Sequence, residues 1–215
     1  MARPRASDHD EKRRTILERS AELFAAHGYD GASLSMLARA CGMSKALLYH
    51  YYTDKSALLV DIIHSHLEHL LAVTAIPDPT PGRDPRGHLL RLAEALLEAY
   101  RHADNKHHVQ LNQLHLLPRP QQKLLKDMER MLVDRFAAAI APCVPAAARD
   151  RAVLKPLTMS LFGMLNWNYL WFREEGPMSR GDYAKMAVTL LVEGAGNLGM
   201  QPAPPGEHVR LLAPV

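Results

Sequence analysis

Nearly every apolar run in this chain of 215 residues has the spacing of a helix. We find no convincing alternation of apolar and polar residues, the pattern that a half-buried strand requires. Isolated helices of this length are marginal in water, so their apolar stripes must be buried against one another. The first such stripe consists of Ile16, Ser20, Leu23, Phe24 and His27. The sequence therefore predicts an all-α protein.

Capping and breaking residues divide the chain into segments. Ser7, Ser33, Ser44 and Asp54 (or Thr53) precede helical stripes, whereas Gly28 and Gly42 interrupt them. Four prolines between Ile76 and Pro85 predict a loop. The helices expected after this loop span 87–102, 105–117, 121–140 and 149–172, and Ser179 caps a last one over 182–194.

Composition excludes several classes of protein. The chain is 47% apolar and 23% charged, close to the average for a soluble globular protein, and a disordered, collagenous or rod-like chain is excluded. Cys41 and Cys143 cannot build a disulfide framework. The charged N-terminus has no apolar signal core. The apolar run 157–172 contains two asparagines and is shorter than the roughly 20 residues of a spanning helix. We expect a cytoplasmic protein that does not enter the membrane.

Two short helices around Gly42 carry the most specific pattern. The first is expected to bury Leu34, Leu37, Ala38 and Cys41. The second has a buried side at Leu48 and Tyr52. This arrangement predicts a helix-turn-helix unit within an N-terminal domain spanning residues 8–56. The polar groups expected at the exposed N-terminal end of the second helix, and just beyond it, are Ser44, Lys45, Tyr49, His50 and Lys55. Free amides and lysines suit phosphates there, and planar polar groups suit base edges.

The N-terminal 60 residues closely resemble the TetR family of one-component repressors. The resemblance is carried by residues 14–17, 21–29, 42–45 and 48–52, together with Leu37, Ala38, Lys55 and Leu58. Two positions depart from the family pattern. Ala46 stands where the family usually has glycine, and Tyr52 stands where it usually has phenylalanine.

This resemblance implies a homodimer that reads an operator in double-stranded DNA and is released by a small-molecule effector. By position, the DNA-contacting residues would be Ser33, Ser44, Lys45, Ala46, Tyr49, His50 and Lys55. Tyr49, His50 and Lys55 would mostly contact phosphates. Tyr51 also falls at a phosphate-contact position, although its stripe makes it half core. We expect Tyr52 to serve core packing.

Residues 57–200 are expected to form a helical domain for ligand binding and dimerisation, followed by a disordered tail at 201–215. Residues 162–167, Trp171, Phe172 and 176–179 resemble TetR-type regulators that respond to acyl-CoA thioesters, as do Leu111, Asn112, Leu117 and Pro118. The resemblance implies control of fatty acid or aromatic acid degradation. The segments 149–172 and 182–194 would then pair with their symmetry mates, which accounts for their apolar character.

Several residues are candidates for the ligand site, each with a structural alternative. Asn166 needs a partner inside so apolar a helix, either a structural hydrogen bond or the ligand. The other candidates are Asn112, His115, Met128, Trp167 and Trp171, and the two tryptophans also fit core or interface packing. The phosphates of a CoA ligand would require cations, and the sequence leaves open the choice among Arg101, Lys106, Arg119, Lys123 and Arg173.

Catalytic and metal-binding patterns are missing from the sequence. Neither His66 with His69 nor His108 with His115 has a third well-placed ligand, so we expect no metal site and no cofactor. There is no nucleophile elbow, phosphate loop or dinucleotide fingerprint, and we expect no enzyme. Two alternatives remain open: a repressor of an efflux pump that senses drugs or hydrophobic compounds, and a helical ligand carrier or enzyme that does not bind DNA.

Overall fold

The computed structural model describes residues 4–145 and 151–197, and within these ranges it contains helices and no strand, which confirms the predicted all-α fold class. The elements are α1 (Pro4–Gly31), α2 (Leu34–Ala40), α3 (Lys45–Tyr51), α4 (Lys55–Val73), α5 (Pro85–Tyr100), α6 (Asp104–Gln113), η1 (Leu114–Leu116), α7 (Arg119–Ile140), η2 (Ala141–Cys143), α9 (Arg151–Asn166), α10 (Asn168–Trp171) and α11 (Arg180–Asn197). The predicted tail at 201–215 lies outside the described residues.

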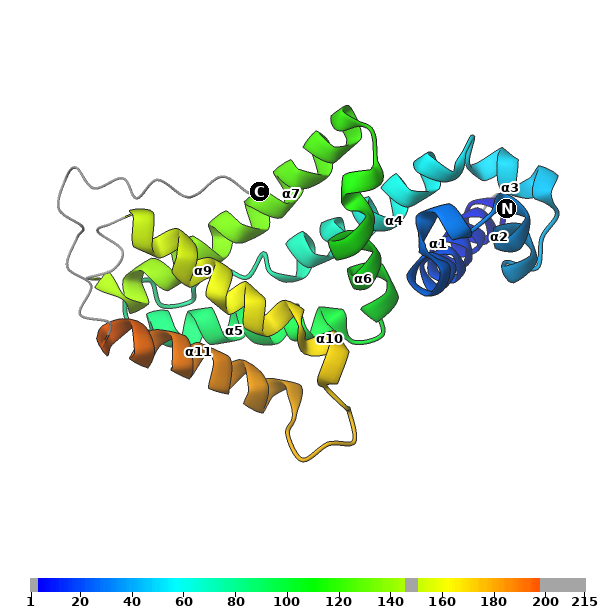
Figure 1. Cartoon of the computed structure of the whole chain (residues 1–215). Helices are drawn as coiled ribbons and strands as arrows, with labels where there is room; N and C mark the ends of the chain where they lie inside the picture. The colour runs from blue at the N-terminus through cyan, green and yellow to red at the C-terminus, as the bar shows by residue number, and fades with distance from the viewer. Residues whose placement is uncertain (1–3, 146–150, 198–215) are drawn as a thin grey trace, which may run out of the picture.

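Helices α1 to α3 gather at one end of the molecule (Figure 1). Ile16 and Phe24 of α1, Leu37 of α2 and Leu48 of α3 are buried in the core there. Gly28 has φ 72° and ψ 167°, values outside the helical region, so the first long helix is interrupted where the sequence predicted. The chain then continues in helical turns to Gly31.

Helix α4 connects this end of the molecule to the remaining helices (Figure 1). Its neighbours are α1 on one side of the molecule and α5, α6 and α7 on the other. The Arg135 guanidinium of α7 donates to the carbonyl of Leu71 at 2.6 Å and to Thr74 Oγ1 at 2.7 Å. The C-terminal end of α4 is thereby fixed to α7, because these acceptors lie at and just beyond its last turn.

By length and composition alone, α4 is the one helix in the described ranges that could cross a membrane, with a mean hydropathy of 1.2. The apolar run 157–172, considered above, does not form one continuous helix. The apolar residues of α4 have partners within the protein, since Leu58, Ile62, Ile63 and Leu67 are fully buried. We therefore interpret α4 as a core helix.

Most helix boundaries lie within a few residues of those predicted. Helix α5 begins at Pro85 rather than at 87, because Asp84 Oδ1 accepts a hydrogen bond from the Gly87 amide. Helix α7 begins at Arg119, two residues earlier than predicted, since a proline in the first turn loses no helical hydrogen bond. The segment expected as one helix over 105–117 is instead α6 followed by the 3₁₀ turn η1.

The prediction of one helix over 149–172 was wrong in its second half. Helix α9 ends at Asn166, Trp167 has φ −81° and ψ −1°, and the short α10 follows. The Asn166 carbonyl accepts a hydrogen bond from Nε2 of His107 at 3.1 Å. A hydrogen bond from α6 thus satisfies the carbonyl at which α9 ends. Residues 149 and 150 lie outside the described residues.

A polar cluster lies inside the larger group of helices. His66 of α4 and His107 of α6 are buried, with ring centroids 5.7 Å apart, and Tyr100 of α5 lies 4.2 Å from the His107 ring. The Tyr100 hydroxyl donates to Asn166 Oδ1 at 2.8 Å. Burial lowers the pKa of His66 to about 3 and that of His107 to about 4, from an ordinary 6.5. Both imidazoles are therefore neutral in the folded protein at pH 7.

We predict that acid destabilises this protein through the two buried histidines. Below pH 6.5 these two histidines bind protons in the unfolded chain but remain neutral in the folded protein. The free energy of unfolding therefore falls as the pH falls. From pH 7.5 to pH 5 each histidine should cost about 2 kcal/mol. Denaturant unfolding at both pH values measures the loss. In His107→Gln the loss should be smaller by about 2 kcal/mol, whereas His69→Gln, at an exposed position of α4, should lose as much as the wild type. An equal loss in all three proteins would contradict the prediction.

Candidate functional site

Helices α2 and α3 begin at the two serines that the sequence predicted. Ser33 Oγ accepts a hydrogen bond from the Met36 amide at 3.2 Å, and Ser44 Oγ accepts one from the Leu47 amide at 3.1 Å. Gly42, with φ 64°, makes the left-handed turn between the helices. Of the four residues expected to be buried in the first helix, Leu37 and Ala38 are buried, whereas Leu34 and Cys41 are half-buried. These local interactions set two short helices at a fixed angle.

The outward side of α3 is polar and carries no carboxylate. Lys45, Ala46, Tyr49 and His50 are all exposed, and the Lys45 ammonium lies 5.8 Å from the centre of the Tyr49 ring. Ser44, at the cap, is exposed as well. Free amides at the start of α3, a cation, a phenol and an imidazole therefore lie on the exposed part of one short helix. This combination suits phosphates and base edges.

Lys55 and Ser33 lie apart from this group. The Lys55 ammonium donates to the carbonyl oxygens of Tyr29 at 2.5 Å and Ala32 at 3.1 Å, and lies 4.3 Å from the centre of the Tyr29 ring. Its charge thus stabilises the end of α1 and the turn that follows, and it is half-buried. Ser33 is exposed at the start of α2. To make the predicted phosphate contact, the Lys55 ammonium would have to bind a phosphate in addition to these carbonyl oxygens.

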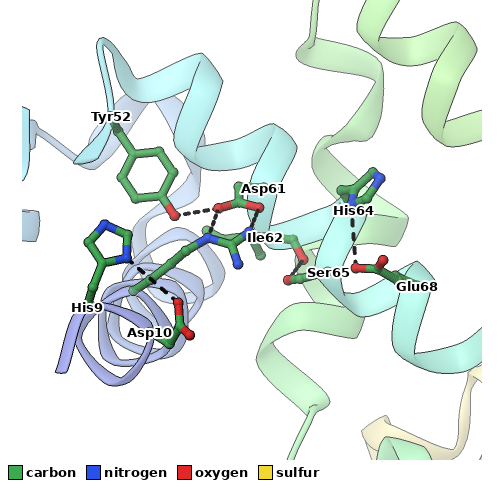
Figure 2. A network of polar contacts seen from close by, with 9 residues as sticks. His9, Asp10, Tyr52, Asp61, Ile62, His64, Ser65 and Glu68 are labelled. Atoms are coloured by element: carbon green, nitrogen blue, oxygen red, sulfur yellow. Dashed lines mark hydrogen bonds and ion pairs between the residues drawn. The ribbon is translucent and has the colours of Figure 1, made fainter. Parts of the chain in front are cut away.

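Tyr52, assigned to packing from the sequence, combines packing with a hydrogen bond. Its side chain is buried at the end of α3, and its hydroxyl donates to Asp61 Oδ2 at 2.5 Å (Figure 2). Arg13 of α1 binds the same carboxylate. Neither Arg13 nor Asp61 was predicted from the sequence. The one signal was Tyr52 itself, because a buried hydroxyl in place of phenylalanine needs a partner.

The candidate ligand residues do not surround one cavity. Asn112 and His115 are exposed, and the Asn112 amide donates to the carbonyl of its own helix at His108. Trp167 and Trp171 are 61% and 52% exposed. Met128 is half-buried against the core. Asn166 has the structural hydrogen bond with Tyr100 that was one of its two predicted roles.

A buried polar stripe on α6 was also missed. His107, Gln110 and Gln113 are spaced three residues apart and are all buried. Gln110 donates to Glu129 Oε1 of α7 at 2.8 Å, and Gln113 donates to the Phe24 carbonyl of α1 at 2.6 Å. His107 Nδ1 and the side-chain oxygens of both glutamines have no hydrogen-bond partner. The residues considered from the sequence lie on the opposite side of α6 and in the turn that follows it: His108, Asn112 and His115.

An open groove of about 650 Å³ lies between α7 and α9. Its floor includes Val133, Ala137 and Leu154, and Lys126 and Lys155 are among the charged residues that line it. Glu129 also lines this groove and accepts the hydrogen bond from Gln110 of the buried stripe. The groove is thus connected to α6 by a hydrogen bond. Among the described residues, no group of three or more His, Cys, Asp or Glu side chains could hold a metal ion.

Two family models match the chain. Residues 16–62 match the model of bacterial regulatory proteins of the tetR family, and residues 82–195 match the tetracyclin repressor-like C-terminal domain. The first match includes α2 and α3, and the second reaches from the loop before α5 into α11.

Solved structures and curated proteins agree with these models. A TetR-family transcriptional regulator from Bordetella parapertussis is 33% identical, with a TM-score of 0.76 over 89% of this chain and 98% of that one. AibR, solved in complex with isovaleryl coenzyme A and operator DNA, is 25% identical, with a TM-score of 0.69 over 84% of this chain and 98% of that one.

Among curated proteins, the transcriptional repressor Rv1474c of Mycobacterium tuberculosis is 36% identical over 64 residues, 30% of this chain and 34% of that protein. The repressor AcnR of Corynebacterium jeikeium is 31% identical over 74 residues, 34% of this chain and 39% of that protein. This chain therefore matches the curated relatives over little more than a third of their length. The two family models together, and the full-length likeness to the Bordetella structure, show that the chain belongs to the TetR family of transcriptional regulators.

Proposed function

We propose that this regulator is a homodimeric, cytoplasmic repressor that reads a pseudo-palindromic operator with helix α3 of each subunit. The observation that supports this most directly is the exposed, carboxylate-free surface of α3, which carries Lys45, Tyr49 and His50 after the Ser44 cap. The operator-reading domain would span residues 8–56 and the ligand-binding and dimerisation domain residues 57–200. A two-fold axis would place the two α3 helices in successive major grooves.

The exposed apolar side chains of α11 support dimerisation through α9 and α11. Met186 and Leu190, one turn apart on α11, are 38% and 58% exposed. Helix α9 packs against α11, so the two helices of the proposed interface are neighbours within one subunit. Apolar area of this kind favours pairing with a second copy of the same helices, as in a four-helix interface.

We propose an acyl-CoA thioester from fatty acid or aromatic acid degradation as the effector. AibR, which binds isovaleryl coenzyme A, has the same fold over nearly its whole length. The groove between α7 and α9 is lined by apolar side chains and by Lys126, Arg130 and Lys155, which outnumber its carboxylates Glu129 and Asp134, and this balance fits an anionic thioester. Of the cations left open by the sequence, Arg101 pairs with Glu98 and Glu174, and Lys123 pairs with Asp127.

Release of DNA would follow from a shift of α6 relative to α1. A ligand in the groove would contact Glu129, which holds Gln110 of α6. Gln113, one turn further along α6, holds the Phe24 carbonyl of α1. An effector that binds one arrangement of these helices more tightly would stabilise that arrangement and change the spacing of the two α3 helices.

We predict that Lys45→Ala weakens binding to the operator found upstream of its own gene or of adjacent genes. The dissociation constant should rise about tenfold. In a plot of the logarithm of the dissociation constant against the logarithm of the salt concentration, the slope should fall by about one for each lost phosphate contact. Electrophoretic shift assays at several salt concentrations measure both. Lys123→Ala, an exposed lysine of α7, is the matched control and should bind as the wild type. Unchanged affinity of Lys45→Ala would remove Lys45 from the interface, and no specific retention at physiological salt by the wild type would contradict DNA recognition altogether.

We predict that acyl-CoA thioesters, and not the corresponding free acids, release the protein from its operator. The phosphates of CoA need cations that a free acid or an uncharged drug does not. Titration of the preformed DNA complex with phenylacetyl-CoA, medium-chain acyl-CoA and each free acid measures release. Release by hydrophobic drugs alone would instead favour the sensor of an efflux substrate. Ligand binding by a protein without any DNA affinity would favour a helical carrier or enzyme.

We predict that Leu190→Glu converts the dimer to a monomer. A charge in the centre of an apolar interface is left unpaired on both subunits. Light scattering on the purified protein measures the mass, and circular dichroism checks that the helices remain. Leu124→Glu, at a position of α7 that is 49% exposed, is the control and should stay dimeric. A monomeric wild type, or a dimeric Leu190→Glu, would place the interface elsewhere.

A further inference from the structure

One carboxylate of α4 connects three helices around the end of α3 (Figure 2). Asp61 receives Nε of Arg13 at 3.0 Å and the second guanidinium nitrogen at 2.5 Å, and the Tyr52 hydroxyl at 2.5 Å. Arg13 lies in α1, and Tyr52 is the residue that caps the C-terminal end of α3. The two oxygens of the carboxylate thus accept three hydrogen bonds from two other helices.

These hydrogen bonds are only partly accessible to water. The side chain of Asp61 is 19% exposed and that of Arg13 is 47% exposed. Burial, and then the hydrogen bond to Asp61, raise the pKa of Tyr52 above its ordinary value, so the phenol remains a donor at all physiological pH values. The bond from the buried Tyr52 hydroxyl to the Asp61 carboxylate is charge-assisted and partly shielded from water, so it is strong and directional.

Helix α3 has limited contacts with the rest of the protein: it packs against α2, and the Tyr51 ring stacks on His9 of α1 with ring centroids 4.8 Å apart. Helix α3 has seven residues, so its length is about 10 Å, and Leu48 is the one fully buried side chain within it. A single buried apolar side chain keeps a helix in contact with the core but does little to prevent the helix from rotating about that contact. Holding the C-terminal end of α3 at Tyr52 fixes where Lys45 and Tyr49 are presented.

We propose that Asp61 and Tyr52 are positioning residues that hold α3 in the orientation required by the operator. Asp61 acts from α4, so the orientation of α3 is set relative to the helix that runs on into the rest of the molecule. Phenylalanine, which the family usually has at the position of Tyr52, could not make the hydrogen bond to Asp61. This inference rests on the proposed role of α3 in reading DNA.

Three variants of the full-length protein test the proposal. Tyr52→Phe keeps the buried ring and removes its hydroxyl, and Asp61→Asn removes the charge with little change in shape. Ser65→Ala is the matched control, because Ser65 of α4 donates only to the carbonyl of Ile62 in its own helix, at 3.1 Å (Figure 2). Dissociation constants are measured for the operator and for a scrambled duplex, at a temperature where unfolding curves show each variant to be folded.

For Tyr52→Phe and for Asp61→Asn, we expect operator affinity to fall about five- to tenfold and affinity for the scrambled duplex to stay within about twofold, because phosphate contacts depend little on orientation. A fourth protein, the double variant Tyr52→Phe/Asp61→Asn, should bind no more weakly than Asp61→Asn, because loss of the Asp61 charge already removes the charge-assisted partner of the Tyr52 hydroxyl. Ser65→Ala should bind both duplexes as the wild type.

Three results would overturn the proposal: wild-type operator affinity in Tyr52→Phe, equal losses on both duplexes, or the same loss in Ser65→Ala. If Asp61→Asn does not fold, Tyr52→Phe alone decides, because it leaves the pair of Arg13 and Asp61 in place. Lys45→Ala separates this inference from the function on which it rests. If Lys45→Ala weakens binding and Tyr52→Phe does not, only the positioning role fails. If neither changes binding, α3 does not read the DNA.

Discussion

The burial of α4 is the interaction on which the rest of the structure depends. Leu58 and Ile62 are fully buried near its start and Leu67 and Leu70 near its end, and its neighbours are α1, α5, α6 and α7. A helix with apolar contacts along its whole length cannot shift at one end without disturbing the other, because packed cores deform little. The small helices α2 and α3 have no comparable core of their own. Their position is therefore determined by what they contact on α1 and α4.

Features that depend on neighbouring residues in the chain could be predicted from the sequence. The caps at Ser33, Ser44 and Asp54 and the break at Gly28 are all present, because a side-chain cap or a left-handed glycine acts within three or four residues. The exposed end of α3 followed from the same local pattern. These predictions needed no knowledge of which helices meet.

Features that depend on contacts between distant segments could not be predicted. Helix α6 carries polar residues on both sides, so periodicity gave no reason to bury His107 and Gln113 rather than His108 and His115. Their partners, Asn166 and the Phe24 carbonyl, are 59 and 89 residues away in the chain. The break between α9 and α10 after Asn166 also coincides with a contact between distant segments, because the Asn166 carbonyl binds His107. Lys55 shows a third case, since its position in the sequence suggested a phosphate and its partners are carbonyls of α1 and the following turn.

Weak overall charge makes orientation important for a protein that must distinguish an operator from other DNA. Residues 1–56 hold nine Lys and Arg against seven Asp and Glu, so general attraction to phosphates is small. Two of these cations, Arg13 and Lys55, bind other parts of the protein. Their charge contributes to holding α1, α3 and α4 together. In the proposed homodimer, affinity would then come from a few groups presented in register by both subunits, and it would depend on the orientation of α3. The weak charge would also favour release by the proposed effector, because little non-specific attraction would retain the protein on DNA.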